Sequence, residues 1–219
     1  MEKVKSLHEA IGNIREGSVV MIPGFLTVGT PGLLVDALVD SGVGDLTVIC
    51  NDTAFPERGI GKLICNRQVK KVITSHIGTN KETGRQMNEG ELEVELVPQG
   101  TLIEQIRAAG AGLGGILTPT GIGTVVEEGK EIIEVNGQRF LLELPLRADV
   151  ALLKAKRADH AGNLVYDKTA RNFNPLIAIA ADLVIAEADE IVEDGEIDPD
   201  HVVTQGIFVD MIVKGRDSQ

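Results

Sequence analysis

Two neutral side-chain amides stand where this sequence leaves a predicted strand. Asn51-Asp52 follows directly on the apolar run that ends at Cys50, and Gln99 lies between a predicted strand and a predicted helix. An amide can donate two hydrogen bonds without adding a charge. Two such donors at one sheet edge would suit an oxyanion that forms at a carbonyl, without permanently trapping a carboxylate substrate. Position alone favours ordinary turn residues at both places, so both interpretations stay open.

A glycine-rich turn at residues 24–31 is a further candidate. It follows the apolar run Val19–Ile22 and precedes a predicted helix, with Thr30 as the expected N-cap and Pro31 at the first helical position. Free N–H groups at a helix N-terminus suit a phosphate or another anion. The turn is neither GxGxxG nor a P-loop, so a tight turn without a ligand is an equal alternative. The candidate contact residues are Gly24, Phe25, Leu26, Thr27, Val28, Gly29 and Thr30.

Other reactive residue types stand in contexts that mark no activated group. The sequence has no GxSxG, no HExxH and no recognisable Ser/His/Asp set. Cys50 and Cys65 form neither a CxxC pair nor a zinc spacing. Cys50 ends an apolar run and is predicted to be a small buried hydrophobe. The sequence therefore predicts no metal site and no nucleophile in this chain.

The elements that must position these residues alternate between helix and strand. The first fifty residues indicate helix, strand, helix, strand, which is typical of a βαβ unit entering a parallel sheet. Leu92, Val94 and Leu96 alternate with glutamates, which indicates a strand with one wet face near a sheet edge. The other expected elements are a helix at 7–14, strands at 46–50, 71–75, 150–153 and 183–186, helices at 59–66, 101–109 and 175–181, a functional glycine-rich loop at 110–123, and a hairpin at 132–144 turning at Asn136-Gly137.

Composition excludes several classes of protein. With 43% hydrophobic and 25% charged residues in 219, the chain should fold as one ordinary globular domain over 1–219. The net charge of −12 argues against a nucleic-acid surface. No apolar run approaches the roughly 20 residues of a membrane span. Few cysteines and no signal-peptide pattern lead us to expect a cytoplasmic setting. The acidic stretch Glu187–Asp200 is expected to be a solvated surface segment.

Longer segments across nearly the whole chain match one known pattern. Pro23-Gly24-Phe25-x-x-x-Gly29-x-Pro31 and Val97-Pro98-Gln99-Gly100-Thr101-Leu102 are two of them. The full set is 16–31, 45–53, 75–80, 90–94, 97–102, 110–115, 118–121, 127–130 and 170–174. In these segments the chain resembles the A subunits of family I (3-oxoacid) CoA-transferases, and most of all the alpha subunits of acetate/acetoacetate (butyrate–acetoacetate) CoA-transferases. One departure is Pro23, where the family usually has glycine; proline offers no N–H to a ligand.

The resemblance implies a fold, a reaction and a partner. The fold is α/β, a mostly parallel open sheet flanked by helices with a small antiparallel hairpin, of the CoA-transferase or NagB/RpiA-like type. The reaction is ping-pong transfer of coenzyme A, a substrate rather than a bound cofactor, between short-chain acyl-CoA or 3-oxoacyl-CoA and acetate or another short-chain acid. The nucleophilic glutamate sits on a B (beta) subunit in a Ser-Glu-Asn-Gly type segment that this chain lacks, within an α2β2 assembly.

The same resemblance assigns roles to the candidate residues. Asn51 and Gln99 would donate hydrogen bonds to the oxyanion or substrate, and residues 24–30 would contact CoA. Neither a metal nor a permanently bound cofactor is implied.

Two other classes of function remain as alternatives. A small-molecule-binding module, such as a sugar-phosphate-sensing regulator domain, would usually carry a DNA-binding helix-turn-helix, and no basic region is present. A sugar-phosphate isomerase on a related α/β fold would need an acid/base set at the strand ends, which the sequence does not display. A dinucleotide-binding domain is disfavoured because the spacing within 24–31 is wrong and no acidic ribose contact is evident.

Overall fold

An eight-stranded sheet forms the centre of the structure, a computed structural model that describes residues 2–216. Its strands follow the order β11-β10-β8-β1-β2-β3-β4, with β9 paired to β8. Every neighbouring pair along this order is parallel, and β9 alone is antiparallel. The predicted mostly parallel open sheet is therefore confirmed. The strands are β1 Val19–Met21, β2 Leu46–Asp52, β3 Val69–His76, β4 Glu93–Leu96, β8 Ala148–Asp159, β9 Leu164–Val165, β10 Ala181–Val192 and β11 Met211–Lys214.

The direction in which strands are added reverses at β1. The chain proceeds outward from β1 through β2 and β3 to β4 at one edge, as predicted for that strand, and later returns to place β8 on the other side of β1. In open α/β sheets, ligands bind beyond the carboxyl ends of the strands at such a switch point. The turn at residues 24–31 directly follows β1, so it lies at this position.

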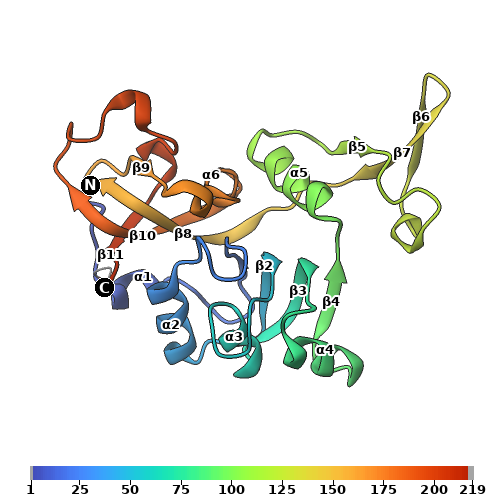
Figure 1. Ribbon diagram of the computed structural model, residues 1–219, viewed down its shortest axis with the longest axis horizontal. Coiled ribbons are helices and arrows are strands. Elements are labelled where there is room, and N and C mark those ends of the chain that lie inside the picture. The colour runs from blue at the N-terminus through green and yellow to red at the C-terminus, as the bar shows by residue number, and fades with distance from the viewer. Residues whose placement is uncertain (1, 217–219) are drawn as a thin grey trace.

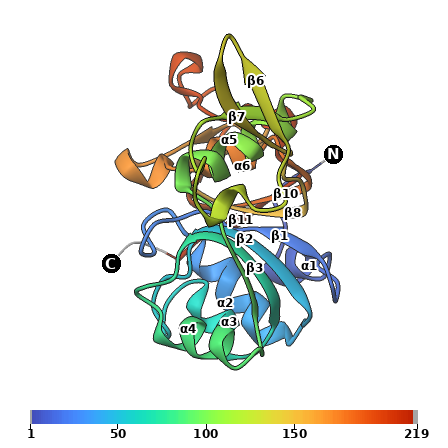
Figure 2. The ribbon, with the colours of Figure 1, turned by 90° about the vertical axis from the view of Figure 1, so that its right-hand side faces the viewer.

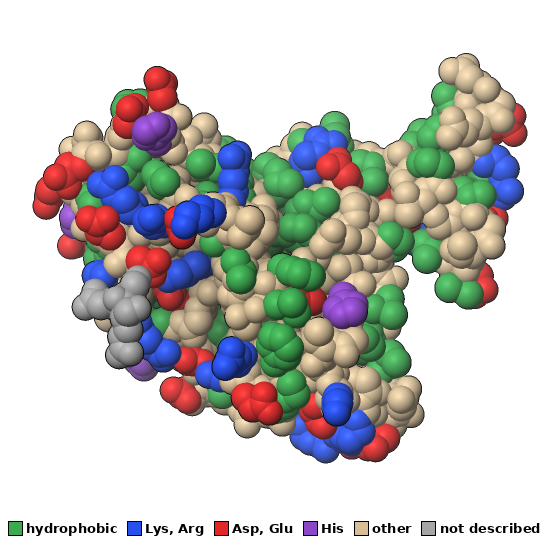
Figure 3. All heavy atoms as spheres, in the orientation of Figure 1, with side chains coloured by type: hydrophobic (Ala, Val, Ile, Leu, Met, Phe, Trp, Pro, Cys, Tyr) green, Lys and Arg blue, Asp and Glu red, His purple; other side chains and the backbone are tan. Residues whose placement is uncertain are grey.

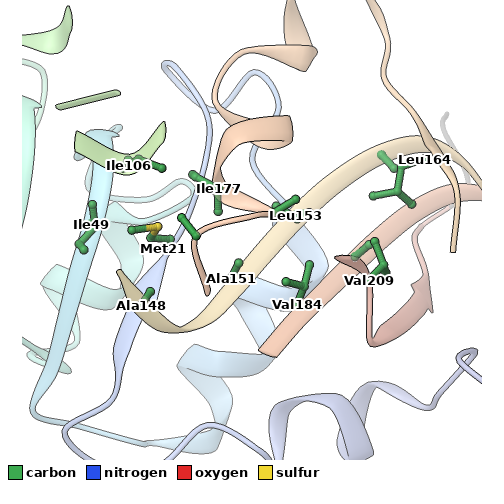
Figure 4. Close-up of a cluster of buried hydrophobic side chains, with 14 of the residues drawn as sticks. Met21, Ile49, Ile106, Ala148, Ala151, Leu153, Leu164, Ile177, Val184 and Val209 are labelled. Atoms are coloured by element: carbon green, nitrogen blue, oxygen red, sulfur yellow. The ribbon is translucent and has the colours of Figure 1, made fainter. Parts of the chain in front are cut away.

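Helices cover both faces of the sheet, and each face has its own apolar core (Figure 2). Val20 and Met21 are neighbours on β1 but belong to opposite cores, because successive strand residues face opposite sides. Figure 4 shows the core beneath α5 and α6, where Met21 and Ile49 of the sheet lie near Ile106. The helices are α1 Leu7–Ile11, α2 Gly32–Ser41, α3 Gly61–Cys65, α4 Lys81–Asn88, α5 Gln99–Gly110 and α6 Asn174–Ile177, with 3₁₀ turns η1 Val125–Glu127, η2 Lys168–Arg171, η3 Pro199–His201 and η4 Gly206–Phe208.

A separate three-stranded antiparallel sheet forms an arm that projects from the body (Figures 1 and 3). The arm consists of β5 Ile116–Thr118, β6 Ile132–Val135 and β7 Gln138–Glu143, in the order β5-β7-β6. Its hairpin turns at Asn136 and Gly137, whose φ angles of 53° and 77° match the type I′ geometry that Asn-Gly predicts. The small antiparallel element expected from the sequence is thus confirmed.

A buried polar cluster ties the arm to α5. The Gln105 Nε2 donates to Glu143 Oε2 at 3.1 Å, and the Lys130 Nζ donates to Glu143 Oε1 at 2.6 Å. Glu143 is only 3% exposed, so its charge is balanced by Lys130 instead of by water. The arm and the helix that begins at Gln99 are therefore held together by these three side chains.

Several expectations from the sequence are wrong in detail. The helix expected at 175–181 ends at Ile177, and the strand expected at 183–186 runs from Ala181 to Val192. Residues 187–192 of the acidic segment thus belong to β10 and are not a solvated loop. Pairing with β8 along β10 outweighs the charge pattern.

Other elements were missed altogether. Helix α4 is mostly polar and lacks an apolar stripe, although Asn80 is a recognisable N-cap whose side chain accepts from the backbone of Glu82 and Thr83. Strands β5, β9 and β11 are short, and β5 lies inside the expected glycine loop. No described helix combines the length and apolarity needed to cross a bilayer. One domain over 1–219 stays a prediction, and residues 1 and 217–219 of that range lie outside the described part.

Candidate active site

Asn51 and Gln99 contact each other directly. Asn51 is the next-to-last residue of β2 and Gln99 is the first residue of α5. The Gln99 Nε2 donates to Asn51 Oδ1 at 2.8 Å. Asn51 is 3% exposed whereas Gln99 lies on the surface, so the pair reaches from the interior to solvent. The structure brings together the two amides that the sequence placed at separate strand ends.

Ser75 of β3 is a third member of this group that sequence reasoning missed. Its Oγ lies 2.9 Å from Asn51 Oδ1 and 2.7 Å from the Asn51 carbonyl oxygen, and it can donate to either. Asn51 Oδ1 thus accepts from Gln99 and can also accept from Ser75. Within residues 2–216 the Asn51 Nδ2 makes no hydrogen bond, so this amide donor remains available. The available signal was the position of Ser75 near the end of a neighbouring parallel strand.

The N-terminus of α5 is open beside these side chains. Its N-cap is Pro98, and no side chain caps its first turn. A hollow of about 510 Å³ lies next to it, between α5 and β5. The hollow is lined by Gly100, Thr101, Glu104, Arg107, Ile116, Leu117, Thr118 and Thr120. Gly100 and Thr101 directly follow Gln99 and line this hollow, so free space adjoins a helix end whose N–H groups have no side-chain cap.

The turn at residues 24–31 has a strained backbone at its tip. Phe25 and Val28 exchange backbone hydrogen bonds of 3.0 and 2.9 Å around Leu26 and Thr27. Leu26 has a φ of 47° and Thr27 a φ of 79°, values that residues other than glycine rarely adopt, least of all a β-branched residue such as threonine. Such strain persists only where the surroundings hold it, and it is concentrated at functional sites. Phe25 and Val28 are nearly half exposed, so the tip presents apolar side chains to solvent.

Asn172, which lies just before α6, and Asn174, the first residue of α6, hold the far side of the turn. The Asn172 Nδ2 donates to the Val28 carbonyl at 2.9 Å, and the Asn174 Nδ2 donates to the Gly29 carbonyl at 3.1 Å. A Cβ at Gly29 would lie 2.5 Å from the Ala170 carbonyl oxygen, which explains the glycine there. These contacts fix the turn above the switch point between β1 and β8.

The expected capping role of Thr30 is wrong. Pro31 is the N-cap of α2, and no side chain caps this helix from its own first turn. The Thr30 hydroxyl instead donates to the Pro23 carbonyl at 3.1 Å. This hydrogen bond joins the two ends of the turn. The Thr30 Oγ1 would lie 1.9 Å from a Cβ at Gly24, so only glycine fits at that position.

The N-terminus of α2 is filled by a carboxylate from a distant strand. Glu187 Oε2, on β10, accepts from the Leu33 N at 2.8 Å and from the Leu34 N at 3.2 Å. Glu187 Oε1 accepts from Lys154 Nζ at 2.9 Å, and Lys154 also pairs with Asp189. Burial opposes the charge of Lys154, but Asp189 and Glu187 outweigh it and raise the pKa of this amine. The Leu33 and Leu34 amides are therefore not open to a ligand in this arrangement.

The remaining reactive side chains offer no alternative centre. Burial raises the pKa of the Cys50 thiol to about 12, so it is not a thiolate near neutral pH. This agrees with its interpretation as a small hydrophobe. Within the described residues, no three His, Cys, Asp or Glu side chains are grouped so that they could hold a metal ion.

Comparisons of sequence relate the chain to one family. Residues 4–215 match the family model described as Coenzyme A transferase. The chain is 59% identical over 217 residues to the alpha chain of the acetate CoA-transferase of Escherichia coli (strain K12), covering 99% of both chains. It is 52% identical over 200 residues to the alpha chain of the acetoacetyl-CoA:acetate/butyrate CoA transferase of Clostridium acetobutylicum, covering 91% of this chain and 92% of the relative.

Comparisons of structure show the same fold at lower identity. An acyl-CoA transferase from Escherichia coli O157:H7, solved as a thioester complex with CoA, matches with a TM-score of 0.90 and 22% identity. The match covers 100% of this chain but only 48% of that chain, so the present chain spans about half its length. Glutaconate CoA-transferase from Acidaminococcus fermentans matches with a TM-score of 0.87 and 23% identity, covering 97% of this chain and 75% of that one.

Proposed function

Because the chain belongs to the coenzyme A transferase family, we propose that it is the α-type subunit of an enzyme that moves CoA between short-chain acids. The donors would be a short-chain acyl-CoA or 3-oxoacyl-CoA, and the acceptor acetate or a similar acid. The observation that carries this proposal is the pair of neutral amides, 2.8 Å apart, at an open helix end, with no activated nucleophile evident among residues 2–216. Such a site can stabilise a reacting carbonyl but cannot attack it.

The reaction then needs a carboxylate from a second chain. The partner's glutamate attacks the thioester carbon, the C–S bond breaks, and a mixed anhydride and free CoA thiolate form. The thiolate attacks the glutamyl carbonyl of the anhydride, which releases the first acid and leaves a glutamyl-CoA thioester. An incoming carboxylate reverses both steps and departs as the new acyl-CoA. CoA is a substrate throughout.

Each of these steps passes through a tetrahedral oxyanion, which gives Asn51 and Gln99 their proposed roles. The free Asn51 Nδ2 and the remaining Gln99 amide proton would donate to that oxygen. Removing one oxyanion donor of this type typically costs about 3–4 kcal/mol of activation free energy. Because both groups are neutral, they do not bind a free carboxylate product as tightly as a cation would.

Residues 24–30 are proposed to contact CoA. Support comes from their place at the sheet's switch point and from the exposed side chains of Phe25 and Val28. Several relatives are named as the alpha or A-type chain of a transferase, which supports a partner chain of the B type. We propose an α2β2 assembly. The family result argues against the regulator and isomerase alternatives.

Mixing the separately purified subunits tests the proposal. We expect neither chain alone to move CoA from acetoacetyl-CoA to acetate, and the mixture to do so with ping-pong kinetics. Light scattering of the mixture measures the stoichiometry independently of activity. Normal turnover by this chain alone would contradict a shared active site, and an inactive but assembled mixture would contradict the proposed substrates.

A further inference from the structure

Asp52 is a buried carboxylate that the proposed reaction does not use. It ends β2 beside Asn51 and is 3% exposed. Its Oδ2 accepts from the Leu26 N at 3.0 Å, and its Oδ1 accepts from the Ala54 N at 2.6 Å. No ion pair of Asp52 occurs within residues 2–216, so backbone N–H groups alone compensate its burial. Burying a carboxylate without a counter-ion costs free energy of folding, and these hydrogen bonds must offset that cost.

Both backbone N–H groups that donate these hydrogen bonds belong to residues with left-handed backbones. The φ angle is 47° at Leu26 and 51° at Ala54, and neither residue is glycine. Leu26 lies in the first turn, Phe25–Val28, and Ala54 precedes a second turn, Phe55–Arg58, with the same backbone pairing of its ends. The two turns are close together, since a Cβ at Gly59 would lie 3.4 Å from the Thr27 methyl carbon.

We propose that Asp52 is a positioning residue whose two carboxylate oxygens hold both turns in their strained conformations. The first turn is thereby fixed over the switch point between β1 and β8, where its contact with CoA is proposed; this step rests on the proposed function. A left-handed leucine costs free energy that a charge-assisted hydrogen bond can offset. Asp52 also follows Asn51 directly. The end of β2 therefore positions both the first turn, through Asp52, and the proposed oxyanion donor Asn51.

The substitution Asp52→Asn separates the two hydrogen bonds. The asparagine oxygen can still accept from Ala54 N, which is the shorter contact and only two residues away. Its Nδ2 then faces the Leu26 N–H, so the bond to the first turn is lost. In the enzyme reconstituted with its partner chain, we expect the KM for acyl-CoA to rise about tenfold, because hydrogen bonds to charged groups have this strength. The kcat at saturation should change much less.

Two glycine substitutions then identify which turn Asp52 serves. Glycine adopts a positive φ without penalty, so Leu26→Gly removes the need for Asp52 in the first turn. Ala54→Gly is the matched control that does the same only at the start of the second turn. We expect the Asp52→Asn effect on KM to shrink severalfold in the Leu26→Gly background and to persist in the Ala54→Gly background. In each background we compare the KM with and without Asp52→Asn, because this ratio cancels the direct effect of the glycine substitution on KM.

Amide hydrogen exchange gives a readout that does not depend on activity. In Asp52→Asn, peptides covering residues 25–28 should exchange faster than in the unsubstituted enzyme. Unchanged exchange would overturn the positioning role, and so would faster exchange with an unchanged KM. An unsubstituted mixture that lacks transferase activity would instead overturn the proposed function. If Asp52→Asn fails to fold, recovery by Leu26→Gly and not by Ala54→Gly supports the proposal, and recovery by neither overturns it.

Discussion

Helices α2 and α5 both begin beyond the carboxyl end of a parallel strand. The N-terminal amides of α2 are occupied by a side chain, whereas those of α5 are not. The first amides of α2 are taken by Glu187, which lies 154 residues away from Leu33. The N-terminus of α5 has no side-chain cap and begins with Gln99. The same local geometry therefore serves the fold in one place and stays open to a reacting group in the other. A helix N-terminus alone does not identify an anion site, because a distant carboxylate can occupy it.

The two ends also differ in charge. The α2 end is a fixed cluster in which Glu187, Lys154 and Asp189 balance one another. At the α5 end the two side chains in contact, those of Gln99 and Asn51, are both neutral. A permanent charge is satisfied at the first end, whereas the second can respond to a charge that exists only during the reaction. Substitutions at α2 should therefore affect stability and substitutions at α5 should affect turnover.

Glu187→Ala should have the largest effect on the folded chain. It exposes the two α2 amides and leaves the partly buried Lys154 with one partner. We expect the free energy of unfolding to fall by about 3–5 kcal/mol, as for other broken buried ion pairs. Urea denaturation of the full chain measures it. Glu187→Gln is the control and should lose less, because its amide oxygen can still accept from Leu33 N. A loss below about 1 kcal/mol for alanine would remove the distinction between the two helix ends.

Gln99→Ala should have the next largest effect, and on turnover. We expect kcat of the reconstituted enzyme to fall about 10²-fold to 10³-fold, in line with the loss of one oxyanion donor. Stability should change little, because Gln99 is exposed. Gln105→Ala is a matched control in the same helix: it loses the contact to Glu143 and should weaken folding by about 1–2 kcal/mol while kcat is kept. Equal kcat values for both variants would contradict a catalytic role for Gln99.

The sequence predicted the residues at the α5 end but not the carboxylate that occupies the α2 end. Asn51 and Gln99 could be placed at strand ends because apolar runs and a helix start flank them, and parallel strands bring such ends to one edge. The occupation of α2 could not be predicted, since Glu187 sits in an acidic stretch whose composition is typical of a solvated surface. Only the register between β8 and β10 aligns Lys154 with Glu187, whose carboxylate is buried there.

The smallest expected effect is the contribution of the α2 end to the pH dependence of stability. The pKa of Lys154 is raised above its unfolded value of about 10.4, so its stabilising contribution is complete below that pH. It is lost as the pH rises through the folded pKa, because the unfolded chain then binds fewer protons than the folded chain. Burial also raises the pKa of Tyr166, whose unfolded phenol ionises above about pH 10, and this destabilises the fold in the same window.

Two substitutions separate these contributions in urea titrations between about pH 9 and pH 11. Tyr166→Phe removes the destabilisation that comes from ionisation of the phenol, so the free energy of unfolding should fall less steeply with pH. The double variant Tyr166→Phe/Glu187→Gln also weakens the ion pair of Lys154 with residue 187, so the decline of stability with pH should be flatter still. Gln99→Ala should leave the slope as in the unsubstituted chain, because Gln99 and its partner Asn51 do not titrate. A slope that responded to Gln99 and not to Glu187 would mean that the charged and neutral helix ends had been assigned the wrong way round.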